Sequence, residues 1–126
     1  MANTGLLAAG ILAVALGVIH SWLGERRILG PLLAPARRQG ILASSAFVRQ
    51  VLRYAWHLTS LAWWGMGAVL AALAFSPLDP QGRIVLACLG ATFLVTGIVI
   101  LVTSRGRHLA WPAFLAIAGL SAAPLL

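Results

Sequence analysis

Three histidines and one glutamate are the side chains of this sequence most suited to chemistry. They are His20, Glu25, His57 and His108. Imidazole nitrogens and carboxylate oxygens are ligands that zinc, iron and other divalent transition metals take in proteins. We therefore predict that these four residues form a transition-metal site, although their spacings match no dedicated metal-binding motif. A metal at this site would activate water or polarise a substrate.

A b-type haem is the weaker alternative to a metal ion at the same place. Two of the histidines would be its axial ligands, and arginines would bind the propionates. The histidines lie near the ends of the apolar segments rather than deep inside them. Met1 and Met66 are the only thioether alternatives. These features favour a metal ion over haem.

Arginines and two residues that follow His57 extend this prediction to an anionic ligand. Arginine binds carboxylates and phosphates with a planar fork of donors. Ser60 and Trp64 follow His57 at helical spacing and share its face. The predicted ligand-binding or anion-binding residues are Arg26, Arg27, Arg53, Arg107, Ser60 and Trp64. The pattern is compatible with an enzyme, a transporter or an accessory subunit, and with a membrane-associated anionic substrate.

Several other chemistries are excluded by the residues available. The chain has no lysine, so it forms no Schiff base. Its two acids, Glu25 and Asp79, are predicted at opposite ends of the molecule. This separation excludes paired carboxylates, and it places Asp79 far from every histidine that a Ser–His–Asp arrangement would need. Cys88 is the single cysteine and forms no internal disulfide.

The composition is that of an integral membrane protein. Hydrophobic residues make up 61% of the 126 residues, charged residues make up 9%, and the mean hydropathy is +0.98. A soluble domain of this size cannot bury so much apolar surface. The net charge is +7, and all nine cations are arginines. Because the arginines flank apolar segments, we predict that they contact anionic lipid head groups and not nucleic acid.

Four apolar segments predict a single all-α domain, 1–126, that forms a four-transmembrane-helix bundle. The predicted spans are about 5–23, 51–75, 83–104 and 109–126. Each reaches across a hydrocarbon core of about 30 Å, the last one only just. The segment 25–50 mixes leucine, proline and arginine, and we expect it to lie in the membrane interface as an amphipathic loop.

The arginines also predict the orientation of the bundle. Eight of the nine lie in or beside the first and third loops, namely Arg26, Arg27, Arg37, Arg38, Arg49, Arg53, Arg105 and Arg107. Because basic loops stay in the cytoplasm, we expect both termini on the outer side of the membrane. The use of arginine without lysine suggests a bacterial genome rich in G and C, and hence the bacterial inner membrane.

Small residues share helical stripes with the histidines. In the first span they are Gly10, Ala13 and Gly17, which precede His20 at intervals of three and four. Membrane helices pack closely along such stripes. The stripes therefore support an alternative function, that of a non-catalytic accessory or assembly subunit in a larger membrane complex or homo-oligomer. The histidines would then be polar contacts between helices.

Three motifs carry a resemblance that covers nearly the whole chain. The motifs are "HSWLGERRIL", "RYAWHLTSLAWWG" and "SRGRHLAW". They resemble segments of a family of small four-helix inner-membrane proteins of bacteria. The resemblance implies a four-helix membrane fold, and it carries no activity and no functional role for any residue.

Overall fold

The computed structural model describes residues 1–126, and every regular element in it is helical. The four longer helices are α1 (Thr4–Gly24), α4 (Ala46–Ala74), α5 (Pro80–Thr103) and α6 (Trp111–Ala122). The shorter elements are a π-helical turn at Glu25–Leu29, α2 (Gly30–Leu33), α3 (Ile41–Ser44), and two 3₁₀ turns at Pro35–Arg37 and Ala123–Leu125. The prediction of an all-α chain is confirmed.

Three helical stretches are long and apolar enough to cross a membrane. They are Thr4–Leu33, Ala46–Ala74 and Pro80–Thr103. The fourth predicted span corresponds to a shorter apolar helix, Trp111–Leu125. The structure is therefore that of an all-helical protein with three candidate membrane-spanning helices.

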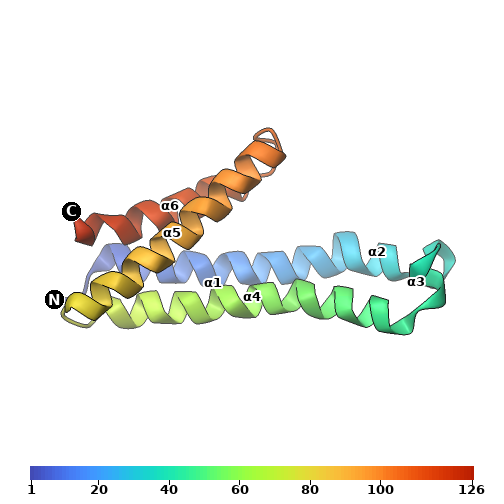
Figure 1. The fold of residues 1–126 in the computed structure, drawn as a ribbon, viewed down its shortest axis with the longest axis horizontal. Helices are drawn as coiled ribbons and strands as arrows, with labels where there is room; N and C mark the ends of the chain where they lie inside the picture. Colours follow the sequence, from blue (N-terminus) through green and yellow to red (C-terminus); the bar gives the residue numbers. More distant parts are fainter.

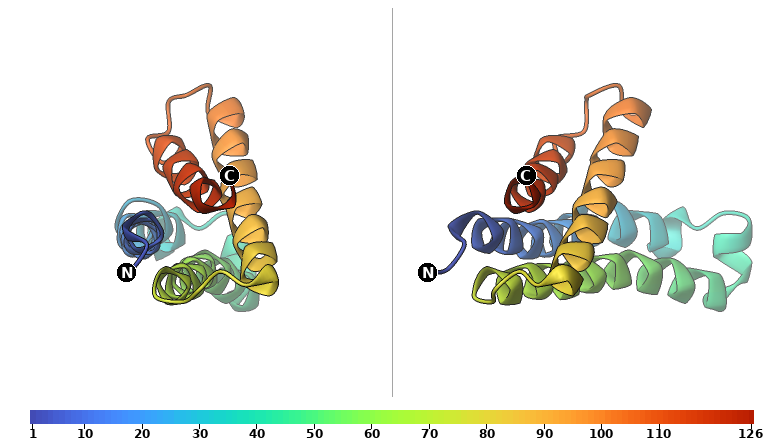
Figure 2. Two further views of the ribbon diagram at one scale, coloured as in Figure 1. Left: turned by 90° about the vertical axis from the view of Figure 1, so that its left-hand side faces the viewer. Right: turned by 60° about the vertical axis from the view of Figure 1, so that its left-hand side comes forward.

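The helices form two antiparallel hairpins. α1 and α4 lie side by side along most of their length, and α5 and α6 form a second hairpin that crosses the first obliquely (Figure 1). α6 packs on α1, whereas α5 makes few contacts with α4 (Figure 2). Both chain termini lie at the end of the molecule where the hairpins meet (Figure 1). Toward the other end the hairpins diverge.

The core fills the region in which the hairpins meet. Its largest fully buried side chains are Phe93, Phe114, Leu6, Leu70, Leu86 and Ile117. Polar contacts fix the adjoining chain ends: the backbone N–H of Asn3 donates to Ala74 O (2.7 Å), and Arg83 donates to Leu125 O (2.8 Å). The apolar packing is thus concentrated away from the divergent end.

Close backbone packing joins α1 to α4. A Cβ atom added to Gly10 would lie 2.7 Å from Gly67 O, and one added to Gly67 would lie 2.8 Å from Gly10 O. Neither position accepts a side chain unless the backbone moves. This mutual contact explains why a small-residue stripe occurs in this part of the first span.

Two tryptophans of α4 lie over glycines of α1. The indole N–H of Trp64 donates to Val14 O (3.1 Å), and a Cβ on Gly17 would collide with its ring. The indole N–H of Trp56 donates to His20 O (3.1 Å), with its ring over Gly24 in the same manner. Trp56 is thus a helix-packing residue of the α1–α4 contact.

The first basic loop is shorter than the predicted 25–50 segment. The first helical stretch continues through the π-helical turn to Leu33, and α4 already begins at Ala46. Arginine side chains satisfy backbone carbonyls in the connection, because Arg38 donates to Leu33 O (2.8 Å) and Arg49 donates to Leu42 O (2.7 Å). These bonds replace the intrahelical bonds that carbonyls lose where a helix ends.

Candidate functional site

A chain of polar contacts links α1 to α4 near the divergent end. His57 Nδ1 lies 2.9 Å from Ser21 Oγ, and His57 Nε2 lies 3.2 Å from Glu25 Oε2. Arg53 Nη2 donates to the other carboxylate oxygen, Glu25 Oε1, at 2.8 Å. Ser60 Oγ lies 2.9 Å from Ser21 Oγ. We call these five residues the Ser–His–Glu network.

Helical spacing brings the network together. Ser21 and Glu25 are four residues apart on the first helical stretch, so they lie one turn apart on the same face. On α4, Arg53, His57 and Ser60 follow one another at intervals of four and three. The antiparallel pairing of α1 and α4 then sets the two faces against each other.

The network lies about one hydrocarbon thickness along the α1–α4 hairpin from the end that holds the chain termini. Ser21 is 18 residues beyond Asn3 and His57 is 18 residues before Phe75, which at about 1.5 Å per residue is about 27 Å along the hairpin. Glu25 and Arg53 lie one further turn out, about 33 Å from the same end. A hydrocarbon core is about 30 Å thick. The Ser21 hydroxyl therefore lies slightly less than one such thickness from that end, and the ion pair lies slightly more than one thickness from it.

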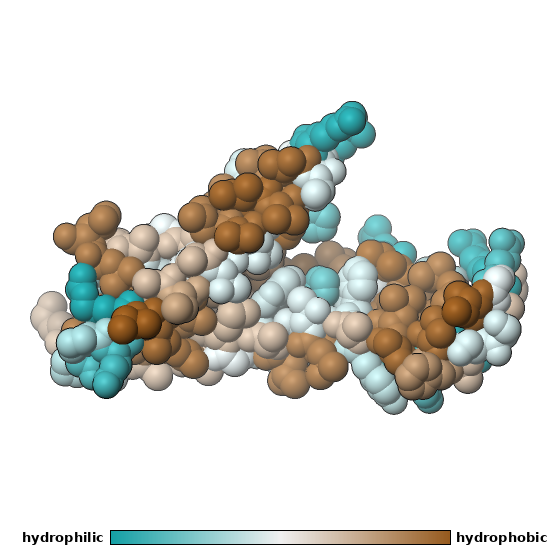
Figure 3. Space-filling model, viewed as in Figure 1, coloured by the Kyte–Doolittle hydropathy of each residue, from teal (hydrophilic) through white to brown (hydrophobic).

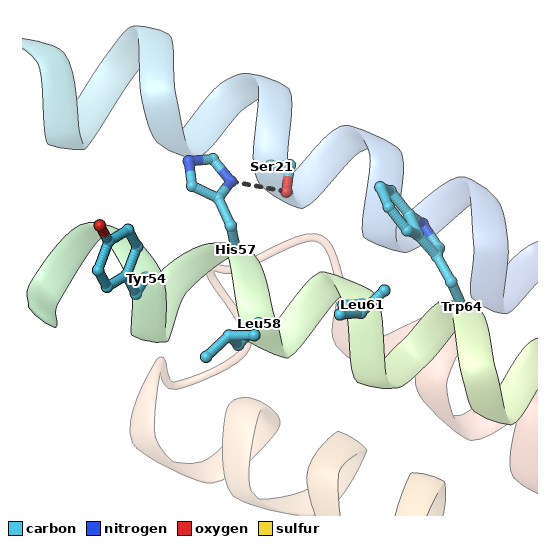
Figure 4. Close-up of a pocket in the computed structure, with 6 residues that line it drawn as sticks. All are labelled: Ser21, Tyr54, His57, Leu58, Leu61 and Trp64. Atoms are coloured by element: carbon cyan, nitrogen blue, oxygen red, sulfur yellow. Dashed lines mark hydrogen bonds between the residues drawn. The ribbon is translucent and has the colours of Figure 1, made fainter. Parts of the chain in front are cut away.

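The network opens on one flank into a narrow apolar groove of about 540 Å³. Ser21 and His57 supply its polar lining, and the other lining residues are Tyr54, Leu58, Leu61 and Trp64 (Figure 4). Ser60 lies behind Ser21 and is fully buried. No charged residue, serine or threonine follows Ser60 in α4, so the network does not continue along this helix.

A second cavity, of about 720 Å³, lies between the two hairpins on the opposite flank. We call it the inter-hairpin cleft. Its polar lining residues are His20, Arg27, Thr103, Ser104 and His108, and its apolar lining includes Leu16, Ile19, Ile100, Trp63 and Phe114. Hydrophilic residues gather at the tip of the α5–α6 hairpin above this cleft (Figure 3). The cleft is apolar inside and polar toward the divergent end.

Aromatic rings hold His20 on the wall of the cleft. Its imidazole stacks on Trp56, with 4.6 Å between ring centroids and 7° between ring planes. Trp63 meets the same imidazole edge-on at 4.8 Å and contacts Phe114 of α6 at 5.0 Å. His20 is therefore positioned by ring packing, and its surroundings couple the two hairpins.

His108 is oriented by the backbone of its own loop. The backbone N–H of Ala110 donates to His108 Nδ1 (3.2 Å), and the N–H of His108 donates to Ser104 Oγ (3.3 Å). Because Nδ1 accepts a hydrogen bond, the neutral imidazole carries its proton on Nε2. His108 therefore presents a hydrogen-bond donor to its surroundings.

The four predicted metal ligands do not assemble into one site. No group of three or more His, Cys, Asp or Glu side chains is close enough to hold a metal ion. His57 and Glu25 contact each other in the network, whereas His20 and His108 line the cleft. A metal-bound imidazole needs a free lone pair on one nitrogen and an acceptor for the N–H of the other. Both nitrogens of His57 already have partners, and Nδ1 of His108 faces a donor, so neither ring is arranged as a metal ligand in this structure.

The predicted anion-binding residues are divided between several places. Arg27 lines the cleft, whereas Arg53 is paired with Glu25. Arg26 lies over the ring of Trp22, 5.1 Å from its centroid. Of the others, Ser60 is inside the network, Trp64 covers the α1–α4 contact, and Arg107 lies in the loop before α6.

Uncompensated positive charge remains around the cleft. Of the nine arginine side chains, only Arg38, Arg49, Arg53 and Arg83 donate hydrogen bonds to protein oxygens. The two acids are engaged elsewhere, because Glu25 binds Arg53 and Asp79 accepts from the N–H of Gly82 (2.7 Å) at the start of α5. No carboxylate therefore lines the cleft beside Arg27.

Sequence reasoning did not identify Trp56 and Trp63 as partners of His20. The two tryptophans are seven residues apart on α4, which places both on one face of the helix. This spacing is the signal in the sequence that the two tryptophans share a face. It does not show which neighbouring helix that face contacts.

Comparison with known proteins assigns no function to the chain. No protein-family model matches it, and neither a curated protein nor a solved structure is significantly similar to it.

Proposed function

We propose that the protein binds an anionic membrane lipid in the inter-hairpin cleft. The observation that carries this proposal is a basic cleft with apolar walls and no carboxylate. Arg27 and the Nε2–H of His108 are donors suited to a phosphate group of the lipid. The side chain of Ser104 adds a hydroxyl on the same wall.

The walls of the cleft fit an acyl chain below this head group. Leu16, Ile19, Ile100 and Phe114 line its interior. An acyl chain moving from the bilayer into such a site exchanges one apolar environment for another, so it gains little from the hydrophobic effect. Selectivity among lipids then depends on the head group, and the excess of arginine favours an anionic one.

The proposal includes a topology with four crossings and both chain ends on the outer side of a bacterial inner membrane. The eight arginines at the divergent end support a cytoplasmic position for that end. Arg83, near the start of α5, donates to Pro124 O (3.3 Å) and Leu125 O (2.8 Å). Because the chain just after α6 contacts the start of α5, α6 must cross back to that side if α5 crosses the membrane.

Native mass spectrometry of the detergent-solubilised protein tests lipid binding. Phosphatidylglycerol and phosphatidylcholine with identical chains are added in equal amounts. We expect phosphatidylglycerol to be retained on the order of tenfold more, equivalent to about 1.4 kcal/mol, and Arg27→Gln to abolish most of this preference. Arg26→Gln removes the same charge from the adjacent position outside the cleft and should preserve it. Equal retention of the two lipids, or equal losses in the two variants, would contradict the proposal.

A further inference from the structure

The Ser–His–Glu network has the connectivity of an activated nucleophile. A hydroxyl lies within hydrogen-bond distance of an imidazole nitrogen, and a carboxylate contacts the other nitrogen of that ring (Figure 4 shows the Ser21–His57 contact). This is the arrangement by which a base activates a serine and a third group orients the base. We propose that Ser21 is the nucleophile of an esterase site that cleaves acyl esters of membrane lipids.

The proton positions required for this role are available in the network. The ion pair with Arg53 requires an ionised Glu25, which accepts the Nε2–H of a neutral His57. Nδ1 is then free to accept the Ser21 hydroxyl proton. Ser60 Oγ lies 2.9 Å from Ser21 Oγ, and because hydroxyl hydrogens rotate, a Ser21 hydroxyl that donates to His57 can accept from Ser60.

The depth of Ser21 matches the position of the scissile group in a lipid. The ester carbonyls of glycerolipids lie between the hydrocarbon and the head groups, and Ser21 lies about 27 Å along the hairpin from Asn3, close to the thickness of a hydrocarbon core of about 30 Å. Tyr54, Leu58 and Leu61 beside it are exposed on the outer flank of α4. The groove therefore admits an acyl chain from the surrounding bilayer.

The reaction needs only the ester and water. Ser21 Oγ forms a bond to the acyl carbon, its proton passes to His57 Nδ1, and the bond from the acyl carbon to the lipid alcohol oxygen breaks. His57 gives that proton to the departing oxygen. Water then attacks the Ser21 ester and gives one proton to His57, which returns it to Ser21 Oγ as the fatty acid leaves. Glu25 and Arg53 position His57 and do not touch the substrate.

This activity goes beyond the proposed lipid binding, because it uses the flank opposite the cleft. The full chain in detergent micelles is treated with a fluorophosphonate, which modifies base-activated serines, and the labelled residue is identified by peptide mass. We expect labelling at Ser21 and none in Ser21→Ala. We expect His57→Gln to slow it on the order of a hundredfold or more, while Ser76→Ala, a distant serine control, labels normally.

A second readout is the release of fatty acid from phosphatidylcholine bearing a fluorescent acyl chain. Release by the folded wild type above the rate of Ser21→Ala supports the esterase. Unlabelled Ser21 in wild type that elutes as a single folded species, together with release no faster than Ser21→Ala, overturns it. The preference for anionic lipid and the labelling of Ser21 are separate readouts, so failure of one proposal is distinguishable from failure of the other.

Discussion

His20 and His57 lie at similar depths on facing helices, yet their surroundings differ. His57 has polar partners on both ring nitrogens, in Ser21 and Glu25. His20 is held by the faces and edges of two tryptophans. The difference follows from helix phase, because residues adjacent in sequence are turned by about 100° around a helix. The neighbouring pair His20 and Ser21 therefore faces two flanks.

On α4 the neighbouring residues Trp56 and His57 likewise face different flanks, so the α1–α4 hairpin contributes one histidine to each flank. The groove flank combines a hydroxyl, an imidazole and a carboxylate beside an apolar wall. The cleft flank combines aromatic rings with unpaired arginine. The α1–α4 hairpin thus has two chemically different flanks at the same distance along its length, and the contact between α1 and α4 separates them.

The largest effect is expected from widening the contact that separates the flanks. Gly67→Ala places a Cβ atom 2.8 Å from Gly10 O. Overpacking against backbone should lower the free energy of unfolding by about 1–3 kcal/mol. Unfolding in detergent micelles with increasing dodecyl sulfate measures it. Gly65→Ala is the matched control, since nothing lies within 4 Å of its Cβ position. Similar destabilisation by both variants would show that the α1–α4 contact is looser than described.

The next effect compares the two histidines directly. His57→Gln removes a ring bonded at both nitrogens and should lower the free energy of unfolding by about 1–2 kcal/mol. His20→Gln removes ring stacking and should lower it by about 0.5–1 kcal/mol. The same unfolding assay ranks the two variants. If His20→Gln were the more destabilising, stacking rather than hydrogen bonding would be the stronger contact at this level.

The smallest effect concerns the ion pair at the edge of the network. The side chains of Glu25 and Arg53 are 40% and 46% exposed, so water screens their attraction. A double-mutant cycle of Glu25→Gln and Arg53→Gln should give a coupling energy below about 1 kcal/mol. The coupling should fall further as NaCl is raised from 0.05 to about 0.5 M. A larger coupling that does not respond to salt would indicate a pair shielded from water.

Residue spacing predicted part of this arrangement. His57, Ser60 and Trp64 share one face of the second span by their spacing, and each of them contacts the first helical stretch. All-helical structure and long apolar helices also follow from composition and periodicity, because an apolar segment must satisfy its backbone groups internally.

The division of the site was not predictable from spacing within single helices. The prediction of one site for His20, His57 and His108 requires four helices that run side by side in a compact bundle. The oblique crossing of the hairpins is set by packing between them, including Trp63 against Phe114. Such long-range packing leaves no periodic signal in one sequence. The predicted metal site therefore combined residues that belong to opposite flanks.

The most direct test of the central claim locates the lipid on the protein. Phosphatidylglycerol with a photoreactive diazirine in its acyl chain is irradiated with the protein in vesicles, and the modified peptides are identified by mass. Binding in the cleft predicts adducts concentrated at residues such as Leu16, Ile19 and Ile100, reduced in Arg27→Gln and unchanged in Arg26→Gln. Adducts spread evenly over exposed faces such as Val95 and Val99, with no response to Arg27→Gln, would contradict it.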